Sequence, residues 1–343
     1  MSNKTPYISV IVPVYNGRAF LHRCLDAVFA SSYRSFEVIV VDDCSTDESG
    51  EIAMTKGVLV LTTHRNSGPA AARNLAAETA AGEILMFVDA DVVVKPDTLA
   101  RVAERLSEHP EFSAVFGSYD DEPAEANFLS QYKNLQHHFV HQNSGSNAFT
   151  FWSGLGAIRR DVFFKFGGFD CKKFALPSIE DIDLGFRLHK AGHQILLDRS
   201  IQAKHLKKWE IRSHLRTEIF HRALPWSKLI LENQGLMNDM NLKTEDRLSA
   251  ALVGLSLITV PLILLRWELI FVTILLVFVI AVLNRKILVF FAKKKGIVFA
   301  SLTFPWQLLY FFYSGVTFVL SWFLYALPRL LGLKRSSPDG WVG

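Results

Sequence analysis

The stretch EILMFVDADVVVKPDT, residues 83–98, contains the clearest indication of how this chain folds. Its apolar run Ile84–Val88 predicts a buried strand, and the strand ends on Asp89 and Asp91, two carboxylates one residue apart. Acidic side chains are almost never buried without a partner. These two aspartates therefore either point into solvent or hold a cation, and the rest of the chain must decide between the two.

Strand and helix signals alternate along the N-terminal part of the chain. Apolar, β-branched runs predict strands at 8–12, 36–41, 58–61 and 84–88. Between them, apolar residues at three- and four-residue spacing from Phe20 to Val28 predict a helix. Ser45 or Thr46 could cap a second helix, and residues 66–82 place a Pro near the start and a Gly past the end of a third. This alternation predicts an α/β fold with a mostly parallel sheet covered on both faces.

Polar residues follow three of the predicted strands. Pro13–Asn16 follow the first strand, Asp42–Asp43 the second and Asp89–Asp91 the fourth. Ligands of open α/β sheets bind beyond the carboxyl ends of the strands. We therefore expect these residues to line one crevice.

The residue types in that crevice indicate which class of ligand it binds. Mg²⁺ and Mn²⁺ take one or two protein carboxylates together with substrate phosphates, so the aspartate pair favours a metal-bound diphosphate over a solvated strand end. No G-x-G-x-x-G follows the first strand and no G-x-x-x-x-G-K-[ST] occurs in the sequence, which argues against the usual dehydrogenases and ATPases. The net charge of +4 gives no case for a nucleic-acid partner and suits an anionic membrane surface better.

Six motifs occur in a fixed order between residues 7 and 206. They are VIVPVYNG (10–17), VIVVDDCSTDES (38–49), NSGPAAARN (66–74), FVDADV (87–92), WSGLGAIRRDVFFKFGGFD (152–170) and IEDIDLGFRLHKAG (179–192). Together they resemble the family 2 glycosyltransferases of the GT-A fold, which are inverting, metal-dependent enzymes that use nucleotide-activated sugars. The resemblance implies a Rossmann-like catalytic domain.

The resemblance also implies roles on the donor side of the site. Asp43 would bind the nucleobase in a pocket lined by Pro13, Tyr15 and Asn16, and Arg73 would lie near the phosphates.

The metal and the base are assigned on the same grounds. Asp91 would coordinate a divalent cation, Mn²⁺ or Mg²⁺, with Asp89 contacting both the ribose and the metal shell and His205 as a further metal or diphosphate ligand. In the Glu180–Asp181 pair, Asp181 would be the general base. An inverting transfer needs a base on one face of the sugar and charge compensation for the leaving diphosphate on the other, so two separated acidic sites are expected. Asp183 is predicted to be structural, paired with Arg187.

His137 and His141 lie one helical turn apart in SQYKNLQHHFVHQN (130–143). No third ligand completes a zinc set at a familiar spacing. A polar helix lining the acceptor cleft and a plain solvated helix face both remain open.

The C-terminal part is strongly apolar. The runs 248–265 and 269–283 contain no charge, and neither does the run 297–328. A bilayer core about 30 Å thick needs roughly 20 apolar residues as helix, and buried soluble helices are the alternative. We expect three spans: a hairpin over 248–283 turned by Arg266–Glu268, and a last span from about Pro305 to Leu327 after a break at Pro305. This arrangement leaves Arg329, Lys334 and Arg335 outside, against the positive-inside rule, and a re-entrant hairpin or a fourth span would correct it.

Basic residues flank these apolar runs. From Lys204 to Arg222, Lys and Arg alternate with apolar residues, which predicts a basic amphipathic helix at the membrane interface or, alternatively, a helix packed on its own domain. A second interfacial helix is expected at 284–296. The absence of a leader-like N-terminus and three cysteines without paired spacing suit a catalytic domain on the cytosolic side.

These observations predict four regions. They are a catalytic domain (1–206), an interfacial helix and linker (207–247), a transmembrane region of about three helices (248–331) and a tail (332–343). The predicted protein is a multi-pass protein of the cytoplasmic membrane. It would transfer a sugar non-processively from a nucleotide-sugar, with UDP favoured, to a polyprenyl phosphate, glycolipid or lipid-linked saccharide in envelope glycan synthesis.

Two other functions are alternatives to this one. A non-catalytic nucleotide-sugar-binding scaffold of an envelope-assembly complex is the first alternative, and a sugar nucleotidyltransferase is the second. The Q-x-x-R-W motif of polymer-extruding synthases is absent from the sequence, which favours non-processive transfer.

Overall fold

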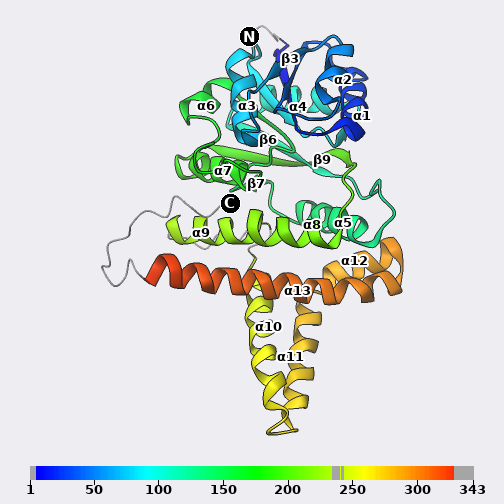
Figure 1. The fold of residues 1–343 in the computed structure, drawn as a ribbon, viewed down its shortest axis with the longest axis vertical. Helices are drawn as coiled ribbons and strands as arrows, with labels where there is room; N and C mark the ends of the chain where they lie inside the picture. The colour runs from blue at the N-terminus through cyan, green and yellow to red at the C-terminus, as the bar shows by residue number, and fades with distance from the viewer. Residues whose placement is uncertain (1–4, 234–239, 241–242, 328–343) are drawn as a thin grey trace. The chain divides into compact units, whose positions relative to one another are not determined.

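The computed structural model describes residues 5–233, 240 and 243–327. The chain divides into two compact units, Met1–Ile211 and Arg212–Gly343. The first unit combines a sheet with helices, whereas the described part of the second is helical (Figure 1). The predicted tail at 332–343 lies outside the described residues, as do Arg329, Lys334 and Arg335.

The first unit is built on a nine-stranded sheet in the order β3-β2-β1-β4-β8-β6-β9-β5, with β7 paired to β9. The strands are β1 Ile8–Val14, β2 Phe36–Asp42, β3 Leu59–Thr62, β4 Ile84–Val88, β5 Val92–Val94, β6 Phe112–Tyr119, β7 Asn147–Ala148, β8 Leu155–Arg159 and β9 Gln194–His205. The α/β fold class predicted from the sequence is confirmed.

The sheet is parallel from β3 through β4 and mixed beyond it. β1 pairs in parallel with both β2 and β4, and β2 with β3. β8 enters antiparallel between β4 and β6, and β5 and β7 pair antiparallel with β9. The antiparallel part depends on pairings between strands far apart in sequence, which local periodicity does not report.

Seven helices accompany this sheet in the described part of the first unit. They are α1 Arg18–Phe29, α2 Ser49–Thr55, α3 Gly68–Thr79, α4 Thr98–Glu108, α5 Phe128–Gln142, α6 Arg160–Lys165 and α7 Glu180–Lys190. The predicted cap of α2 at Ser45 or Thr46 is wrong, because α2 begins at Ser49. Pro69 lies in the first turn of α3, as predicted.

The core of the first unit joins the sheet to α1 and α4. Val10, Val12 and Met86 are fully buried against Leu21 and Leu25. Burying one such aliphatic side chain contributes about 1.5–3 kcal/mol. This core fixes the carboxyl ends of β1, β2 and β4, where the polar residues lie.

The second unit contains an antiparallel helical pair and a long apolar helix. Its elements, together with α8, which begins at the unit boundary, are α8 Ile211–Arg216, η1 Thr217–Ala223, α9 Leu224–Asn233, α10 Thr244–Leu262, α11 Leu269–Leu283, α12 Arg285–Lys295, α13 Ile297–Ser321 and η3 Trp322–Ala326. α10 packs along α11, and α13 packs against α9, α10 and α12.

Two predictions for this region are corrected. The basic helix does not extend from Lys204, because Lys204 and His205 end β9 and the helix begins at Ile211. The predicted break at Pro305 is wrong, because α13 continues through it. Proline removes one backbone hydrogen bond from a helix, yet α13 stays continuous and packs against α9, α10 and α12.

Membrane spans can be judged by length and composition. One described helical segment, Ile297–Tyr325, is long and apolar enough to cross a bilayer, with a mean hydropathy of 1.5. α11 and α12, which meet at a 68° bend, could together form a second.

Candidate active site

The loops after β1 and β2 hold each other at one edge of the sheet. The backbone N–H of Asn16 donates to Ser45 Oγ (3.0 Å), and the N–H of Thr46 donates to Asn16 Oδ1 (2.7 Å). Asn16 has φ 51° and Cys44 φ 61°, left-handed conformations in which Asn is enriched. Tyr15, half exposed, and Pro13 lie in the same segment, beside the loop that carries Asp43.

Asp43 organises the loop that leads into α3. Its carboxylate is buried and accepts hydrogen bonds from Thr63 Oγ1 (2.7 Å) and from the N–H groups of Ser67 (2.9 Å) and Gly68 (2.7 Å). Gly68 adopts φ +83°, and a Cβ there would overlap the carbonyl of Ala175. The loop therefore requires both Asp43 and a glycine.

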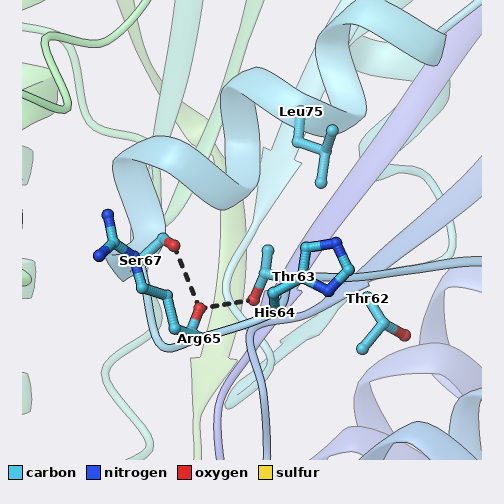
Figure 2. A pocket seen from close by; sticks show the side chains of 6 residues that line it. All are labelled: Thr62, Thr63, His64, Arg65, Ser67 and Leu75. Carbon is cyan, nitrogen blue, oxygen red and sulfur yellow. Dashed lines mark hydrogen bonds between the residues drawn. The ribbon is translucent and has the colours of Figure 1, made fainter.

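A pocket of about 440 Å³ opens beside this loop (Figure 2). Ser67 Oγ donates to the carbonyl oxygen of Arg65 at 3.1 Å, and Thr63 Oγ1, whose single hydrogen is shared with Asp43, lies 2.8 Å from the same oxygen. The lining residues are Thr62, Thr63, His64, Arg65, Ser67 and Leu75. Polar side chains and a basic group thus surround a cavity next to Asp43.

Arg73 connects two acidic segments. From α3, its Nη2 donates to Asp89 Oδ1 at 2.7 Å, and its Nη1 donates to Glu180 Oε1 at 2.8 Å. The side chain of Arg73 is only 4% exposed. The family resemblance implies a place near the phosphates for Arg73; in the structure its guanidinium bridges the end of β4 and the start of α7.

One guanidinium does not neutralise the carboxylates around it. Burial raises the pKa of Asp89, with Asp91 and Asp181 adding to the rise and Arg73 opposing it. Burial likewise raises the pKa of Glu180; Arg73 opposes this rise and Asp181 adds to it. The crevice therefore has an excess of negative charge that favours a cation.

Asp91 and His205 come together through strand pairing. β5 and β9 are antiparallel with Val92 opposite His205, and the N–H of Leu206 donates to the carbonyl of Asp91 (2.8 Å). His205 Nε2 lies 3.5 Å from Asp91 Oδ2. Burial alone would raise the pKa of Asp91, but His205 and Lys207 outweigh it and hold the pKa below its ordinary value.

The side chains near Asp91 can be compared with the ligands that a divalent cation needs. Among the described residues, no group of three or more His, Cys, Asp or Glu side chains is arranged to hold a metal. Asp91 and His205 supply two adjacent ligand atoms, while one oxygen of Asp89 is paired with Arg73. Such a set fits a cation that completes its coordination with substrate phosphates and water.

Asp181 lies at the start of α7, next to Glu180. Its Oδ2 accepts hydrogen bonds from the N–H (2.9 Å) and the Oγ (3.0 Å) of Ser153. The helix macrodipole favours a carboxylate at this end. Asp183 accepts from Arg187 Nε (2.8 Å) and Lys173 Nζ (3.1 Å), so the predicted Asp183–Arg187 pair is confirmed.

An aromatic cluster next to the acidic residues was not singled out from the sequence. Tyr119 stacks on His205 with centroids 4.2 Å apart and also contacts His137 (4.4 Å) and the edge of Trp152 (4.8 Å). Trp152 directly precedes Ser153, which holds Asp181. In the sequence, only the positions of these residues could have indicated the cluster. Tyr119 is the last residue of β6, and Trp152 is the first residue of the motif at 152–170.

His141 belongs to neither of the environments expected for it. It is buried, its Nδ1 lies 3.0 Å from the carbonyl oxygen of Gly117, and its ring packs on His137 and Trp152. Burial lowers its pKa to about 4. The helix face predicted as polar or solvated is therefore partly core.

Residues 9–167 match the family described as Glycosyl transferase family 2. The chain carries a family 2 glycosyltransferase domain. It is 28% identical over 234 residues to glycosyltransferase GlyA of Streptococcus pneumoniae serotype 4, covering 63% of this chain and 33% of that relative. The chain thus spans a third of the length of this relative.

Solved structures share the fold of the glycosyltransferase domain. TarS 1–349 of Staphylococcus aureus in complex with UDP-GlcNAc has a TM-score of 0.52 at 21% identity, covering 66% of each chain. The mannosyltransferase PcManGT of Pyrobaculum calidifontis, in complex with GDP-Man and Mn²⁺, has a TM-score of 0.56 at 17% identity, covering 92% of this chain and 88% of that one. These likenesses confirm the GT-A fold predicted from the sequence.

Proposed function

We propose that this chain is an inverting, metal-dependent, non-processive glycosyltransferase that moves a sugar from a nucleotide-sugar to a membrane-associated acceptor. One observation carries the proposal: Arg73 bridges two acidic segments, the end of β4 and the start of α7. On one side Asp91 and His205 lie 3.5 Å from each other, and on the other Asp181 is oriented by Ser153. An inverting transfer requires these two separate functions.

The donor would bind across the carboxyl ends of β1, β2 and β4. Pro13, Tyr15 and Asn16 would contact the nucleobase beside the loop that Asp43 shapes, and Asp89 would meet the ribose. TarS binds UDP-GlcNAc and PcManGT binds GDP-Man. We favour a UDP-sugar for this chain.

Asp91 and His205 would hold the divalent cation, Mn²⁺ or Mg²⁺. When bound, the cation would supply charge compensation for the departing diphosphate. Arg73 keeps Asp89 and Glu180 fixed on the two sides of the site, and the stacked ring of Tyr119 orients His205.

Asp181 would act as the general base. A partly exposed carboxylate held by Ser153 can accept the proton of an acceptor hydroxyl or phosphate as that oxygen attacks the anomeric carbon. Trp152 directly precedes Ser153, and His137 packs on Trp152. Both aromatic side chains would border the acceptor.

The acceptor is proposed to be lipid-linked: a polyprenyl phosphate, a glycolipid or a lipid-linked saccharide of the cell envelope. The second unit supports this proposal, because it exposes many large apolar side chains, including Leu264, Phe271 and Phe278. Exposed apolar surface of this kind is typical of membrane contact. The catalytic domain would face the cytosol from the cytoplasmic membrane.

The test is turnover of nucleotide-sugars by the full chain in detergent. UDP-, GDP- and dTDP-sugars are each offered with Mn²⁺ or Mg²⁺, with and without membrane lipids. We expect metal-dependent release of one nucleotide. Asp181→Asn should lower kcat by about 10²–10⁴-fold while leaving nucleotide binding intact, and Asp91→Asn should remove the metal dependence.

Asp97→Asn is the matched control, because the Asp97 side chain is half exposed and pairs with Arg101 at the start of α4. It should retain full activity. Nucleotide-sugar binding without any turnover, in every lipid tried, would favour the non-catalytic scaffold instead.

A further inference from the structure

We propose that α10 and α11 cross the bilayer as a two-helix hairpin, while α13 lies along the membrane surface and does not cross it. The chain would then return to the side on which the glycosyltransferase domain lies. This inference rests on the membrane attachment proposed above but not on sugar transfer.

The hairpin has a polar seam and an apolar exterior. Thr259 Oγ1 and Thr273 Oγ1 lie 2.8 Å apart between the two helices, and Ser256 is buried. Small residues and hydroxyl pairs of this kind bind helices together in lipid. The exposed side chains facing outward are large and apolar: Leu255, Leu257, Ile258, Val260, Ile270, Phe271, Val272, Ile274, Leu275 and Phe278.

The hairpin also approaches the length of a membrane crossing and has charges at its two ends. α10 has 19 residues and α11 has 15, or about 28 and 22 Å of helix at 1.5 Å per residue, against a hydrocarbon core of about 30 Å. Arg266 and Glu268 at the tip and Arg247 and Arg285 at the base bracket two charge-free runs. Trp267 at the tip is 65% exposed, as expected of an aromatic residue at the far interface.

Among the described residues, α13 packs on the half of this hairpin that lies away from its tip. Phe311 of α13 packs with Val253, midway along α10, and with Ile280 near the end of α11, and Gly315 lies beside Ala250. Figure 1 shows α13 running across the hairpin where its two helices begin and end. A third span alongside the hairpin would instead contact it toward the tip.

The buried face of α13 cannot lie in hydrocarbon. Tyr313, near the middle of the apolar segment, lies with its hydroxyl 3.3 Å from Glu218 Oε2, and Glu218 accepts a hydrogen bond from Arg222 (2.9 Å). If α13 crossed the bilayer, this ion pair would sit near its centre, where charged side chains are costly. Its other buried positions are also largely polar: Thr303, Gln307, Thr317 and Ser321.

The segment Ile297–Tyr325 is also long for a single crossing. Its 29 residues make about 43 Å of helix at 1.5 Å per residue. Its outward face exposes Leu302, Phe312 and Val316. A helix with one polar buried face and one apolar exposed face suits the membrane interface.

α12 adds positive charge next to α13. It carries Arg285 and Lys286 at its start and Lys293–Lys295 at its end, and it packs against α13. Basic residues beside a membrane contribute about 1 kcal/mol each toward anionic headgroups.

The test is the side of the membrane reached by two probes in bacterial cells expressing the full chain. A Trp267→Cys variant, in a background with Cys44→Ser and Cys171→Ser, is treated with a membrane-impermeant maleimide before and after permeabilisation. A green fluorescent protein fused after Gly343 reports the other end, since it fluoresces only in the cytosol. We expect maleimide labelling of position 267 in intact cells and a fluorescent fusion.

A non-fluorescent fusion that is present at full length in the membrane would show that α13 crosses, and would overturn the proposal. Labelling of position 267 only after permeabilisation, or in neither state, would show that the hairpin does not reach the far side. The Asp91→Asn variant should give the same two results, because topology does not depend on catalysis. Failure of this inference is therefore distinguishable from failure of the proposed function.

Discussion

Arg73 is the residue on which the two halves of the site depend. Its partner Glu180 lies 107 positions away in the sequence, and its other partner, Asp89, ends a buried strand. A buried charge is tolerated only when it is paired and hydrogen-bonded. Losing the guanidinium would leave two carboxylates with raised pKa values facing each other without a cation.

Arg73→Ala should lower the free energy of unfolding by about 3–5 kcal/mol, because it leaves buried charges uncompensated. Arg73→Lys should recover only part of that loss, since one ammonium cannot reproduce the fork that reaches both carboxylates. Chemical denaturation of the full chain in detergent measures both. Arg65→Lys, an exposed arginine, is the control and should change stability by no more than about 0.5 kcal/mol; equal losses at positions 65 and 73 would contradict the bridging role.

His141 should make the folded protein sensitive to acid. Its pKa of about 4 in the folded state lies below the ordinary value of 6.5, so between these values the unfolded chain binds more protons than the folded one. The stabilisation is complete above pH 6.5 and is lost as the pH falls toward 4. Between about pH 7 and pH 5 this amounts to on the order of 2 kcal/mol.

His141→Gln should therefore lose less stability than the parent chain over that interval, whatever its stability at neutral pH. Denaturation curves at the two pH values give the difference. His64→Gln, at an exposed histidine, should keep the parental pH dependence. An unchanged acid sensitivity in His141→Gln would show that other groups cause it.

At the scale of elements, Gly185 determines how closely α7 packs on the segment that contains Thr150 and Phe151. A Cβ on Gly185 would overlap the backbone nitrogen of Phe151 and come within 2.6 Å of the carbonyl carbon of Thr150. The helix can thus approach the segment that leads to Trp152 and Ser153 only because position 185 has no side chain. The same helix presents Glu180 and Asp181 to the site.

Gly185→Ala should destabilise the chain by about 1–3 kcal/mol through overpacking and should lower kcat, because α7 would be pushed away from Ser153. Thermal unfolding and turnover are measured together. Gly254→Ala is the matched control: Gly254 is also helical, and a Cβ there meets nothing within 4 Å. If the two variants behaved alike, close approach at position 185 would not be what positions the helix.

At the scale of the whole molecule, the chain consists of two compact units with separate hydrophobic clusters. A ligand that binds one folded unit stabilises that unit by mass action. The proposed donor site lies entirely within the first unit, so stabilisation should be confined to it.

Calorimetry of the full chain in detergent should therefore show two transitions. UDP with Mn²⁺ at about 100 times the dissociation constant should raise the stability of one transition by about 2.7 kcal/mol and leave the other unchanged. Chelation of the metal should reverse the shift. A single transition, or two that shift together, would show that the units unfold cooperatively.

The sequence by itself determined the elements with strong local patterns. The strands β1 to β4 and the helices α1 and α3 follow from hydrophobic periodicity and from Gly and Pro positions, which act over a few residues. The placement of polar residues at the ends of β1, β2 and β4 follows from the same pattern, and the motif order indicated the GT-A fold.

Only the tertiary structure decided how distant segments combine. The bridge from Arg73 to Glu180, the pairing that brings His205 to Asp91 and the contact of Tyr119 with His205 all join residues far apart in sequence. The continuity of α13 through Pro305 likewise depends on the helices packed around it. Local propensity sets the conformation of a segment, whereas burial, charge pairing and packing are properties of the assembled chain, so these features could not be read from periodicity alone.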